Sequence, residues 1–374
     1  MRVAFLVCHL TGTGHLARTL ALARAVAAAG GRPLVLSGGR ALAHHDWEGT
    51  AFHPLPPLRV DGFDYATLRR MDGAVAPPLY LEERRRQIVE ALARFEPDVL
   101  VTETFPLGRR RLAAEFEAAI DAVQAIRPQA RILASVRDIP EPPSRPERLV
   151  EATQRIIARF DRILVHGEAD LVPLSASWPL PPEAAARVGH TGYIGRSDLR
   201  PARRGDEVLV SVGGGVLGRR LLGVAVEAAG LVDRPWCLLV GGPDAASVAA
   251  CLAEAAPPNL VAEPARPDYP DLLAAAACSV SLAGYNTVMD LAACRTPAVI
   301  VPFAEHGERE QSLRAEALAA LPGLSVLSGA TLTAASLAQA VSAAACAPDR
   351  PAWPFARDGA RRAALAILEE PRDP

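Results

Sequence analysis

Three turns in the sequence join an apolar run to a helix through small residues, and each offers chemistry for binding an anion. The last turn lies in SLAGYNTVMDLAAC, residues 281–294. Its backbone N–H groups, at Gly284, Tyr285, Asn286 and Thr287, would lie at the positive end of a helix dipole, where a diphosphate is stabilised. One helical turn further, the carboxylate of Asp290 could accept hydrogen bonds from the two hydroxyls of a ribose. By itself, Asp290 is equally explained as a charge that compensates the helix N-terminus.

The first turn reads TGTGH over residues 11–15 and leads into a helix rich in Leu and Ala. Gly14 and His15 would stand at the carboxyl end of the first strand, the edge at which open α/β sheets bind ligands. The positive end of a helix disfavours a protonated imidazole, so His15 could act as a general base. The alternative is that His15 only caps the helix or anchors the loop.

The middle turn carries Gly213, Gly214 and Gly215 after another strand. Without Cβ atoms, these residues let a phosphate approach the backbone, although a tight turn needed only for packing would look the same.

Carboxylates and amides after other strands complete the set of candidates. Glu103 and Asp138 each follow a strand of the first half and are further candidates for the base. Glu103 is also explained by an exposed charge pair with the arginines at 109–111, which would contribute little stability. Adjacent Glu310 and Gln311 are side chains that grip sugar hydroxyls through paired hydrogen bonds, or they simply begin a solvated helix. No role is predicted for His306.

The elements that must position these residues are apolar, β-branched runs that alternate with helical patterns. Such runs, buried on both faces, predict parallel sheets covered by helices on each side. Because both halves open with a strand and a Gly-rich turn, we expect two Rossmann-like domains in tandem. The predicted strands are 3–7, 32–37, 98–103, 131–136, 162–167, 207–213, 236–242, 259–263, 279–284 and 298–303.

The domain boundaries follow from composition. The stretch 190–206 is rich in Gly, Arg, Pro and Asp, as a linker is, which predicts an acceptor-side domain over 1–197 and a donor domain over 198–349. The remainder, 350–374, is expected to be a turn and a helix that cap one of the domains. The irregular, Pro-rich stretch 51–81 is expected to be a loop that selects the acceptor.

Composition excludes several classes of function. The net charge is −2, which gives no general attraction to nucleic acid, and the chain contains no lysine, so Lys-based chemistry is absent. The six cysteines show neither a zinc nor a disulfide spacing. No apolar run is long enough to span a membrane, and the first residues look like a buried strand instead of a signal peptide, so we expect a cytoplasmic protein.

The motifs together resemble a known family. AGYNTVMDLAACRTPAVIVPF followed by EHGEREQSLRAEALA is similar to the C-terminal signature of the MurG-like inverting glycosyltransferases, and TGTGHLAR and SVGGGVLG follow in that family's order. TETFPLGRRRL, SVRDI and FDRILVHG resemble an uncharacterised bacterial branch of predicted glycosyltransferases. The resemblance implies a GT-B fold: two Rossmann-like, doubly wound parallel-sheet domains that face a central cleft.

The resemblance also implies roles for individual residues. Gly284 and Thr287 would lie by the diphosphate, Asp290 would bind the ribose, and Glu310 and Gln311 would face the donor sugar. Two departures from the pattern of the lipid II enzymes leave the sugar open: Asp290 replaces a Glu, and Glu310 replaces a Gln. The rest of the implied set has Gly213, Gly214 and Gly215 at the phosphates, with Gly14, Tyr285 and Asn286 nearby, and His15 at the acceptor hydroxyl.

The predicted function is therefore transfer of a sugar from a nucleotide diphosphate sugar, with a UDP-sugar as the leading choice, to an acceptor hydroxyl. We expect inversion, no metal and no other cofactor, because helix N–H groups would stabilise the leaving diphosphate. The acceptor is left open between a lipid-linked and a polysaccharide precursor. Peripheral contact with the inner face of the membrane through 83–87 and 107–111 is weighed against a solvated basic face.

Two alternatives remain. The same fold serves sugar-nucleotide epimerases and hydrolases, and it also serves non-catalytic proteins that bind a nucleotide sugar. A dinucleotide oxidoreductase fits less well, because the first turn lacks G-x-G-x-x-G and no acidic residue ends the second strand.

Overall fold

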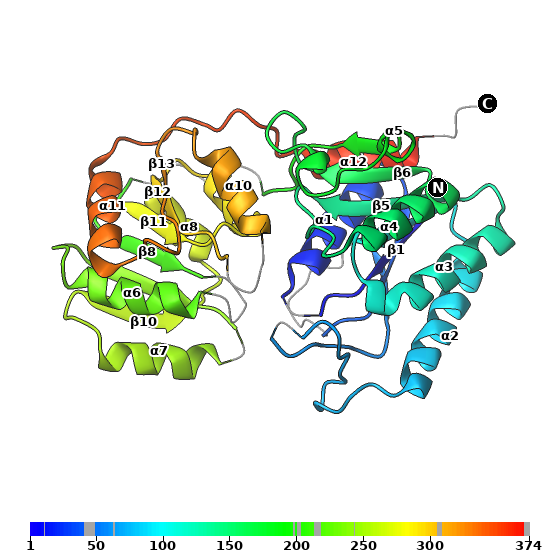
Figure 1. The fold of residues 1–374 in the computed structure, drawn as a ribbon, viewed down its shortest axis with the longest axis horizontal. Coiled ribbons are helices and arrows are strands. Elements are labelled where there is room, and N and C mark those ends of the chain that lie inside the picture. The colour runs from blue at the N-terminus through cyan, green and yellow to red at the C-terminus, as the bar shows by residue number, and fades with distance from the viewer. Residues whose placement is uncertain are drawn as a thin grey trace. The chain divides into compact units, whose positions relative to one another are not determined.

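The computed structural model divides the chain into two compact units (Figure 1). Unit 1 comprises Met1–Ile194 together with Asp358–Pro374, and unit 2 comprises Gly195–Arg357. The sequence placed the boundary near residue 198 and the start of the C-terminal cap at 350, whereas the units divide at 195 and at 358. The structure describes residues 1–10, 12–40, 49–62, 64–196, 199, 203–212, 218–242, 244–304 and 309–369.

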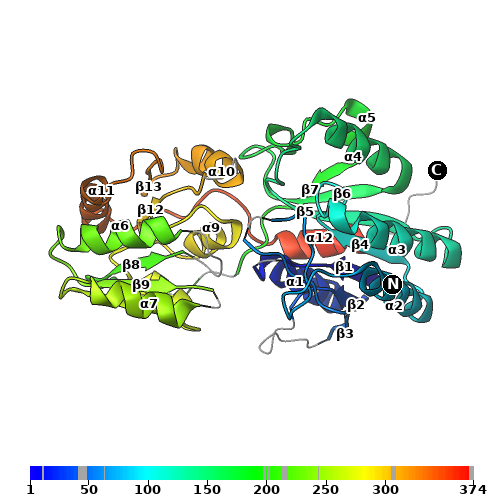
Figure 2. The ribbon, with the colours of Figure 1, turned by 60° about the horizontal axis from the view of Figure 1, so that its bottom comes forward.

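Unit 1 is built on a parallel sheet of seven strands, in the order β3-β2-β1-β4-β5-β6-β7 (Figure 2). From β1, the chain adds β2 and β3 on one side of the sheet and then returns to add β4 to β7 on the other side. The carboxyl ends of β1 and β4 therefore flank the point where the strand order reverses, which is where open α/β sheets bind ligands. The strands are β1 (Arg2–Val7), β2 (Arg32–Ser37), β3 (Ala51–Pro54), β4 (Val99–Glu103), β5 (Arg131–Arg137), β6 (Arg162–His166) and β7 (Val188–His190).

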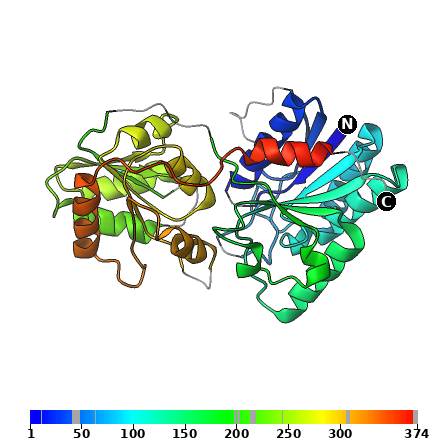
Figure 3. The ribbon, with the colours of Figure 1, turned by 90° about the horizontal axis from the view of Figure 1, so that it is seen from above.

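Helices cover both faces of this sheet, as continuous apolar strands require. On one face, Val101 and Leu133 of the sheet pack with Leu20 of α1 and with Ile367 of α12, the C-terminal helix. α12 lies beside α1, so the residues that end unit 1 complete its core (Figure 3). The described helices of the unit are α1 (Gly14–Ala28), α2 (Pro78–Phe95), η1 (Arg110–Leu112), α3 (Ala113–Ile126), α4 (Pro146–Arg159), η2 (Leu174–Ala176), α5 (Pro182–Ala185) and α12 (Gly359–Leu368).

Unit 2 contains a parallel sheet of six strands in the order β10-β9-β8-β11-β12-β13, so its reversal point lies between β8 and β11. Val210 and Val280 of these two strands pack in one core with Leu222 of α6 and Leu337 of α11. The strands are β8 (Val208–Ser211), β9 (Trp236–Val240), β10 (Leu260–Pro264), β11 (Cys278–Ser281), β12 (Ala298–Ile300) and β13 (Leu324–Val326). The helices are α6 (Arg219–Ala229), α7 (Ala245–Glu254), α8 (Tyr269–Ala275), α9 (Tyr285–Ala292), α10 (Glu310–Leu318) and α11 (Ala334–Cys346).

All ten predicted strands are present, and the expectation of two parallel-sheet α/β domains is confirmed. The sequence missed β3, β7 and β13, which have four, three and three residues and lie at sheet edges. The expected irregular stretch 51–81 is wrong at both ends, because β3 and the start of α2 occupy them. Among the described helices, none is long and apolar enough to cross a membrane.

Candidate active site

The reversal point of unit 1 brings His15 and Glu103 together, although 88 residues separate them in sequence. Glu103 is the last residue of β4, and His15 is the second residue of α1, which follows β1. The imidazole Nδ1 of His15 lies 3.0 Å from Oε1 of Glu103. Because an ionised carboxylate can only accept, this contact favours the tautomer in which Nδ1 carries the proton and donates a hydrogen bond to Glu103, although Nη2 of Arg18 also lies 3.2 Å from Nδ1. This tautomer leaves Nε2 with a lone pair.

The dyad of His15 and Glu103 is held by two further side chains. Arg18, one turn along α1, forms an ion pair with Oε1 of Glu103. The hydroxyl of Thr104 donates to the same oxygen at 3.1 Å. Glu103 is only 2% exposed and Arg18 only 4%, whereas 21% of the His15 side chain remains exposed. The dyad therefore presents its imidazole to solvent and keeps its carboxylate inside.

Charge and burial keep the imidazole neutral. The pKa of His15 falls from 6.5 to about 3, mainly because burial penalises the cation and next because the Arg109 guanidinium repels it. The hydrogen bond to Glu103 acts in the opposite direction but does not outweigh them. At neutral pH His15 is thus unprotonated, as a general base must be.

The carboxylate stays ionised in spite of its burial. Burial alone would raise the pKa of Glu103, but the charge of Arg18 and the hydrogen bond from His15 hold that pKa well below 4.5. An ionised carboxylate beside a neutral imidazole is the arrangement that orients histidine bases and stabilises the cation they form.

The backbone after Glu103 is strained. Thr104 has φ of 69°, a left-handed conformation that a β-branched residue rarely adopts. A side chain at Gly108 would meet the Thr104 methyl group at 2.5 Å, so Gly108 makes room for this bend. Strain of this kind is typical of functional sites, and here it turns the Thr104 hydroxyl toward Glu103.

The structure adds two residues that the sequence did not single out. The Ser135 hydroxyl in β5 donates to Oε2 of Glu103 at 2.8 Å, and Nε2 of His166, at the end of β6, lies 2.9 Å from that hydroxyl. A weak signal was available: each residue stands two positions after a buried leucine of its strand, Leu133 before Ser135 and Leu164 before His166, and therefore points to the same face.

Asp138, the third candidate for the base, is fully buried just after β5. Its Oδ1 accepts the backbone N–H of Ile139 at 2.8 Å, and a Cβ at Gly167 would meet the Asp138 Cβ at 2.7 Å. A carboxylate enclosed in this way does not reach an acceptor from solvent, so its burial favours a structural role. The role of Asp138 as a base remains an untested prediction.

Unit 2 places the expected diphosphate turn at its own reversal point. β11 ends at Ser281, which pairs with Ser211 at the end of β8, and α9 follows after Gly284, its N-cap. The N–H groups of Asn286 and Thr287, in the first turn of α9, have no acceptor within the helix and can bind an anion. The Asn286 side chain is exposed and that of Tyr285 is buried, with Arg314 over its ring at 5.8 Å. Tyr285 can therefore contribute its backbone more readily than its ring.

Asp290 lies on the following turn of α9 and is one-fifth exposed. Its carboxylate accepts from Nε of Arg196 at 3.0 Å. Burial raises the pKa of Asp290 above 3.8, and Arg196 opposes that rise. The carboxylate is thus available at the surface of the unit but already has a cationic partner.

The side chains of Glu310 and Gln311 make structural contacts within unit 2. Oε1 of Gln311 accepts the N–H groups of Ala283 at 3.0 Å and of Phe303 at 3.1 Å, which ties the ends of β11 and β12 to α10. Glu310 forms a buried ion pair with Arg314, whose guanidinium also donates to the Ala283 carbonyl. These contacts fix the residues beside the diphosphate turn, and binding of a donor sugar by Glu310 and Gln311 remains a prediction.

Other predicted residues are only partly described. Gly14 is the first residue of α1 and is partly exposed beside His15. Gly213, Gly214 and Gly215, and also His306, lie outside the described residues.

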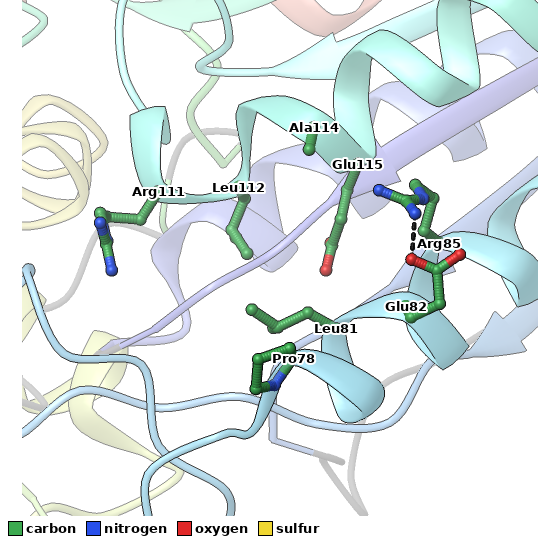
Figure 4. A pocket seen from close by; sticks show the side chains of 8 residues that line it. All are labelled: Pro78, Leu81, Glu82, Arg85, Arg111, Leu112, Ala114 and Glu115. Atoms are coloured by element: carbon green, nitrogen blue, oxygen red, sulfur yellow. Dashed lines mark hydrogen bonds and ion pairs between the residues drawn. The ribbon is translucent and has the colours of Figure 1, made fainter.

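A cavity of about 260 Å³ lies between α2 and the η1–α3 segment of unit 1 (Figure 4). Leu81 and Leu112 line it together with Arg85 and Arg111, from the two basic runs that the sequence weighed for membrane contact. Arg85 pairs with Glu82 at the rim. The cavity shares none of its lining residues with the dyad.

Three comparisons with known proteins bear on this geometry. A family model described as "Glycosyltransferase family 28 C-terminal domain" matches residues 239–363. A curated relative from Prochlorococcus marinus (strain MIT 9303) is 39% identical over 64 residues. It is named UDP-N-acetylglucosamine--N-acetylmuramyl-(pentapeptide) pyrophosphoryl-undecaprenol N-acetylglucosamine transferase. That match covers 17% of this chain and 18% of the relative, so it spans less than a fifth of either protein.

Solved structures match nearly the whole chain at low identity. MurG of Acinetobacter baumannii is 15% identical with a TM-score of 0.58, and the match covers 98% of this chain and 99% of that one. The calicheamicin glycosyltransferase CalG4 is 18% identical with a TM-score of 0.57, covering 98% and 94%. A UDP-glucosyltransferase from Polygonum tinctorium is 12% identical with a TM-score of 0.62, covering 99% and 95%. These structures confirm the GT-B fold, and the family model and the curated relative support the resemblance to MurG-like glycosyltransferases.

Proposed function

We propose that this chain, a MurG-like glycosyltransferase of the GT-B fold, moves a sugar from a nucleotide diphosphate sugar to an acceptor hydroxyl with inversion and without a metal ion. The observation that carries the proposal is the dyad of His15 and Glu103 at the reversal point of unit 1. It supplies a neutral, partly exposed base whose second nitrogen is oriented by a buried carboxylate.

The proposed reaction is a single displacement. The acceptor oxygen attacks the anomeric carbon of the donor, Nε2 of His15 takes the proton from that oxygen, and the bond from the anomeric carbon to the diphosphate breaks. Glu103 stabilises the imidazolium that forms, as the carboxylate of a catalytic triad does. Attack from the face opposite the leaving group inverts the anomeric configuration, and the mechanism uses no covalent sugar intermediate.

The leaving diphosphate is proposed to lie at the N-terminus of α9. The N–H groups after Gly284 and the positive end of the helix dipole would stabilise its charge, the task that a divalent cation performs in other transferases. Asp290 would accept hydrogen bonds from the ribose hydroxyls. A UDP-sugar is the proposed donor because the curated relative is named for UDP-N-acetylglucosamine.

The acceptor is proposed to be a lipid-linked or polysaccharide precursor in the synthesis of the cell envelope or another glycoconjugate. We propose that the reaction takes place in the cytoplasm, at or near the inner face of the membrane, because the curated relative is named for an undecaprenol-linked acceptor.

The first experiment is a thermal-shift screen of the purified protein against UDP, GDP, dTDP, CDP and ADP in the presence of EDTA. Binding at about a hundredfold excess over the dissociation constant contributes about 3 kcal/mol of stability. We expect one nucleotide to stabilise the protein and Asp290→Ala to abolish that shift. Asp271→Ala, at an exposed position of α8, is the control and keeps the shift. A shift that appears only when divalent cation is added would contradict metal independence.

Incubation with the identified donor separates the remaining functions. Release of free sugar or of an epimer without any acceptor would favour a hydrolase or an epimerase. Binding without turnover by any acceptor, unchanged in His15→Ala, would identify a non-catalytic nucleotide-sugar protein. The transferase predicts that His15→Ala lowers kcat by about 10²-fold to 10⁴-fold while nucleotide binding persists.

A further inference from the structure

A chain of hydrogen bonds continues from Glu103 across the carboxyl edge of the unit 1 sheet. Ser135 donates to Oε2 of Glu103 at 2.8 Å, and Nε2 of His166 lies 2.9 Å from the Ser135 hydroxyl. Nδ1 of His166 lies 2.8 Å from the hydroxyl of Thr191, the first residue after β7. We call Ser135, His166 and Thr191 the edge network. All three are buried, at 1%, 0% and 5% exposure.

The register of the sheet explains why these residues meet. Glu103 pairs with Ser135 across β4 and β5, so the two side chains point to the same face. Ser135 pairs with Leu164 of β6, and His166 stands two residues beyond Leu164, again on that face. Thr191 follows His190, the residue opposite Val165, and therefore lies beside His166. Together with Glu103, the edge network thus forms one row across β4, β5, β6 and the end of β7.

The same face is otherwise apolar. Two positions before Glu103, Ser135 and His166, their strands carry Val101, Leu133 and Leu164, which belong to the core under α1 and α12. Glu103, Ser135 and His166 bring buried polar groups to the carboxyl edge of this face. A buried polar row of this kind costs stability unless every member is satisfied, and the hydrogen bonds described above give each member a partner.

The directions of the bonds follow from the donors available. Ionised Glu103 can only accept, so the single proton of the Ser135 hydroxyl points to Oε2. Nε2 of His166 must then donate to the Ser135 oxygen, and Nδ1 must accept from Thr191. The alternative acceptors of the Thr191 hydroxyl, the carbonyls of Val165 and Gly192, are farther away at 3.4 and 3.3 Å. Every bond therefore points toward Glu103.

We infer that the edge network is a positioning device for the dyad: His166 fixes the Ser135 hydroxyl as a donor, which anchors Oε2 of Glu103 and holds Oε1 against Nδ1–H of His15. This inference rests on the proposed function, in which His15 is the base. His166 touches no reacting atom and moves no proton during the reaction. It acts through Glu103, by keeping the proton of His15 on Nδ1 and the lone pair on Nε2.

The test reads the tautomer of His15 directly, without any acceptor. Protein labelled with ¹⁵N-histidine gives distinct nitrogen signals for protonated and unprotonated ring nitrogens, and His15→Gln and His166→Gln assign the two residues. In the wild type we expect His15 to be protonated at Nδ1 and His166 at Nε2. The informative variants are Ser135→Ala, which removes the hydroxyl, and His166→Phe, which removes the donor and keeps a ring.

The expected result is that both variants lose the single Nδ1–H state of His15 and give mixed tautomers. His166→Gln, whose amide donates from a position close to that of Nε2, restores the wild-type signal in part. The control is Ser279→Ala, a buried serine of unit 2 with no hydrogen-bond partner in the described structure, which leaves His15 unchanged. An unchanged His15 spectrum in folded Ser135→Ala would overturn the inference. Ser135→Ala decides the matter even where His166→Phe does not fold.

The result of the tautomer test can be distinguished from the result of the test of the proposed function. Nucleotide binding by unit 2 is measured on the same variants and is expected to stay as in the wild type. Failure of every nucleotide to bind would remove the donor site, yet the spectra would still decide whether the edge network positions His15. With an acceptor in hand, the two variants lower kcat and leave the KM for the donor unchanged, whereas a general loss of folding would alter both.

Discussion

The guanidinium of Arg196 lies 3.0 Å from the carboxylate of Asp290, on the residue that the proposed donor site needs for the ribose hydroxyls. Arg196 is half exposed and Asp290 is four-fifths buried, so the carboxylate carries most of the desolvation. In the proposed donor site, the ribose hydroxyls would have to share or replace this ion pair. The raised pKa of Asp290 indicates that its buried charge costs the free protein stability.

Asp290→Asn should stabilise the free protein at pH 7.5 while it abolishes stabilisation by nucleotide. Burial raises the pKa of Asp290, so the folded protein binds this proton more tightly than the unfolded chain, and stability falls as pH rises through that pKa. The asparagine amide carries no charge, so the variant does not lose stability in this way at pH 7.5. Thermal unfolding with and without nucleotide measures both effects, and Asp271→Asn is the matched surface control. A lower melting temperature of the free variant would show that the carboxylate is structural.

Arg109→Gln should raise the pKa of His15. After burial, the positive charge of Arg109 is the largest cause of the low value of about 3, and glutamine removes that charge. NMR titration of the His15 imidazole measures the change. Arg111→Gln, in the same basic run, serves as the control and should leave the titration as it is. Equal curves for wild type and Arg109→Gln would mean that burial alone sets the pKa.

Acid should weaken the fold well before the carboxylates titrate. In the folded protein the pKa values of His15 and His166 fall from 6.5 to about 3, so the unfolded chain takes up protons first as the pH is lowered. The contribution of these two residues to the free energy of unfolding is therefore fully present above pH 6.5 and is lost as the pH falls toward 3. Glu103 has a lowered pKa and adds to the loss only below about 4.5. Urea unfolding between pH 7.5 and 5 measures the decline.

In that range, His15→Gln should reduce the slope of unfolding free energy against pH by about 1.4 kcal/mol per pH unit near pH 5, the amount for one proton. Ser279→Ala removes no titrating group and should keep the full slope. A slope in His15→Gln as steep as in the wild type would contradict the lowered pKa of His15.

Arg84→Ala should destabilise unit 1 by about 3–5 kcal/mol, because it leaves a buried carboxylate without its partner. Nε and Nη2 of Arg84 contact the two oxygens of Glu115 at 2.7 and 2.8 Å, and Nη1 donates to the carbonyls of Gly38 and Pro56. The pair also fixes the loop after β3, so protease should cut that loop faster in the variant.

The next residue supplies the control for Arg84. Arg85 pairs with Glu82 on the exposed side of α2, and such pairs contribute at most about 1 kcal/mol. Denaturant unfolding of Arg84→Ala and Arg85→Ala should separate the two cases. A similar fall in unfolding free energy in both variants would mean that the positive charge of α2, and not the buried contact of Arg84 with Glu115, stabilises the unit.

The strands were predictable because both sheets bury both faces, so each inner strand reads as an unbroken apolar run. The edge strands β7 and β13 have only three residues each and depend on pairing with a neighbour that the sequence does not reveal. Propensity over so few residues carries little weight against tertiary contacts.

The candidate site was predictable in its residue types and less so in their partners. His15 and Glu103 were both candidates for the base, and their shared place at the carboxyl edge followed from strand ends. That Glu103 orients His15 depends on the adjacency of β1 and β4, which chain order does not state. Gln311 illustrates the reverse: its amide looked free for a sugar, whereas its oxygen holds two backbone N–H groups.

The packing of α12 on α1 has a consequence for the order of folding during synthesis. The ribosome makes the strands of unit 1 first, then all of unit 2, and only afterwards residues 359–368, which cover α1. Until those residues emerge, the apolar face formed by Leu20 and its neighbours has no cover and is open to chaperones or to aggregation. The helix that carries His15 is therefore among the first to be translated and the last to be locked into its final packing.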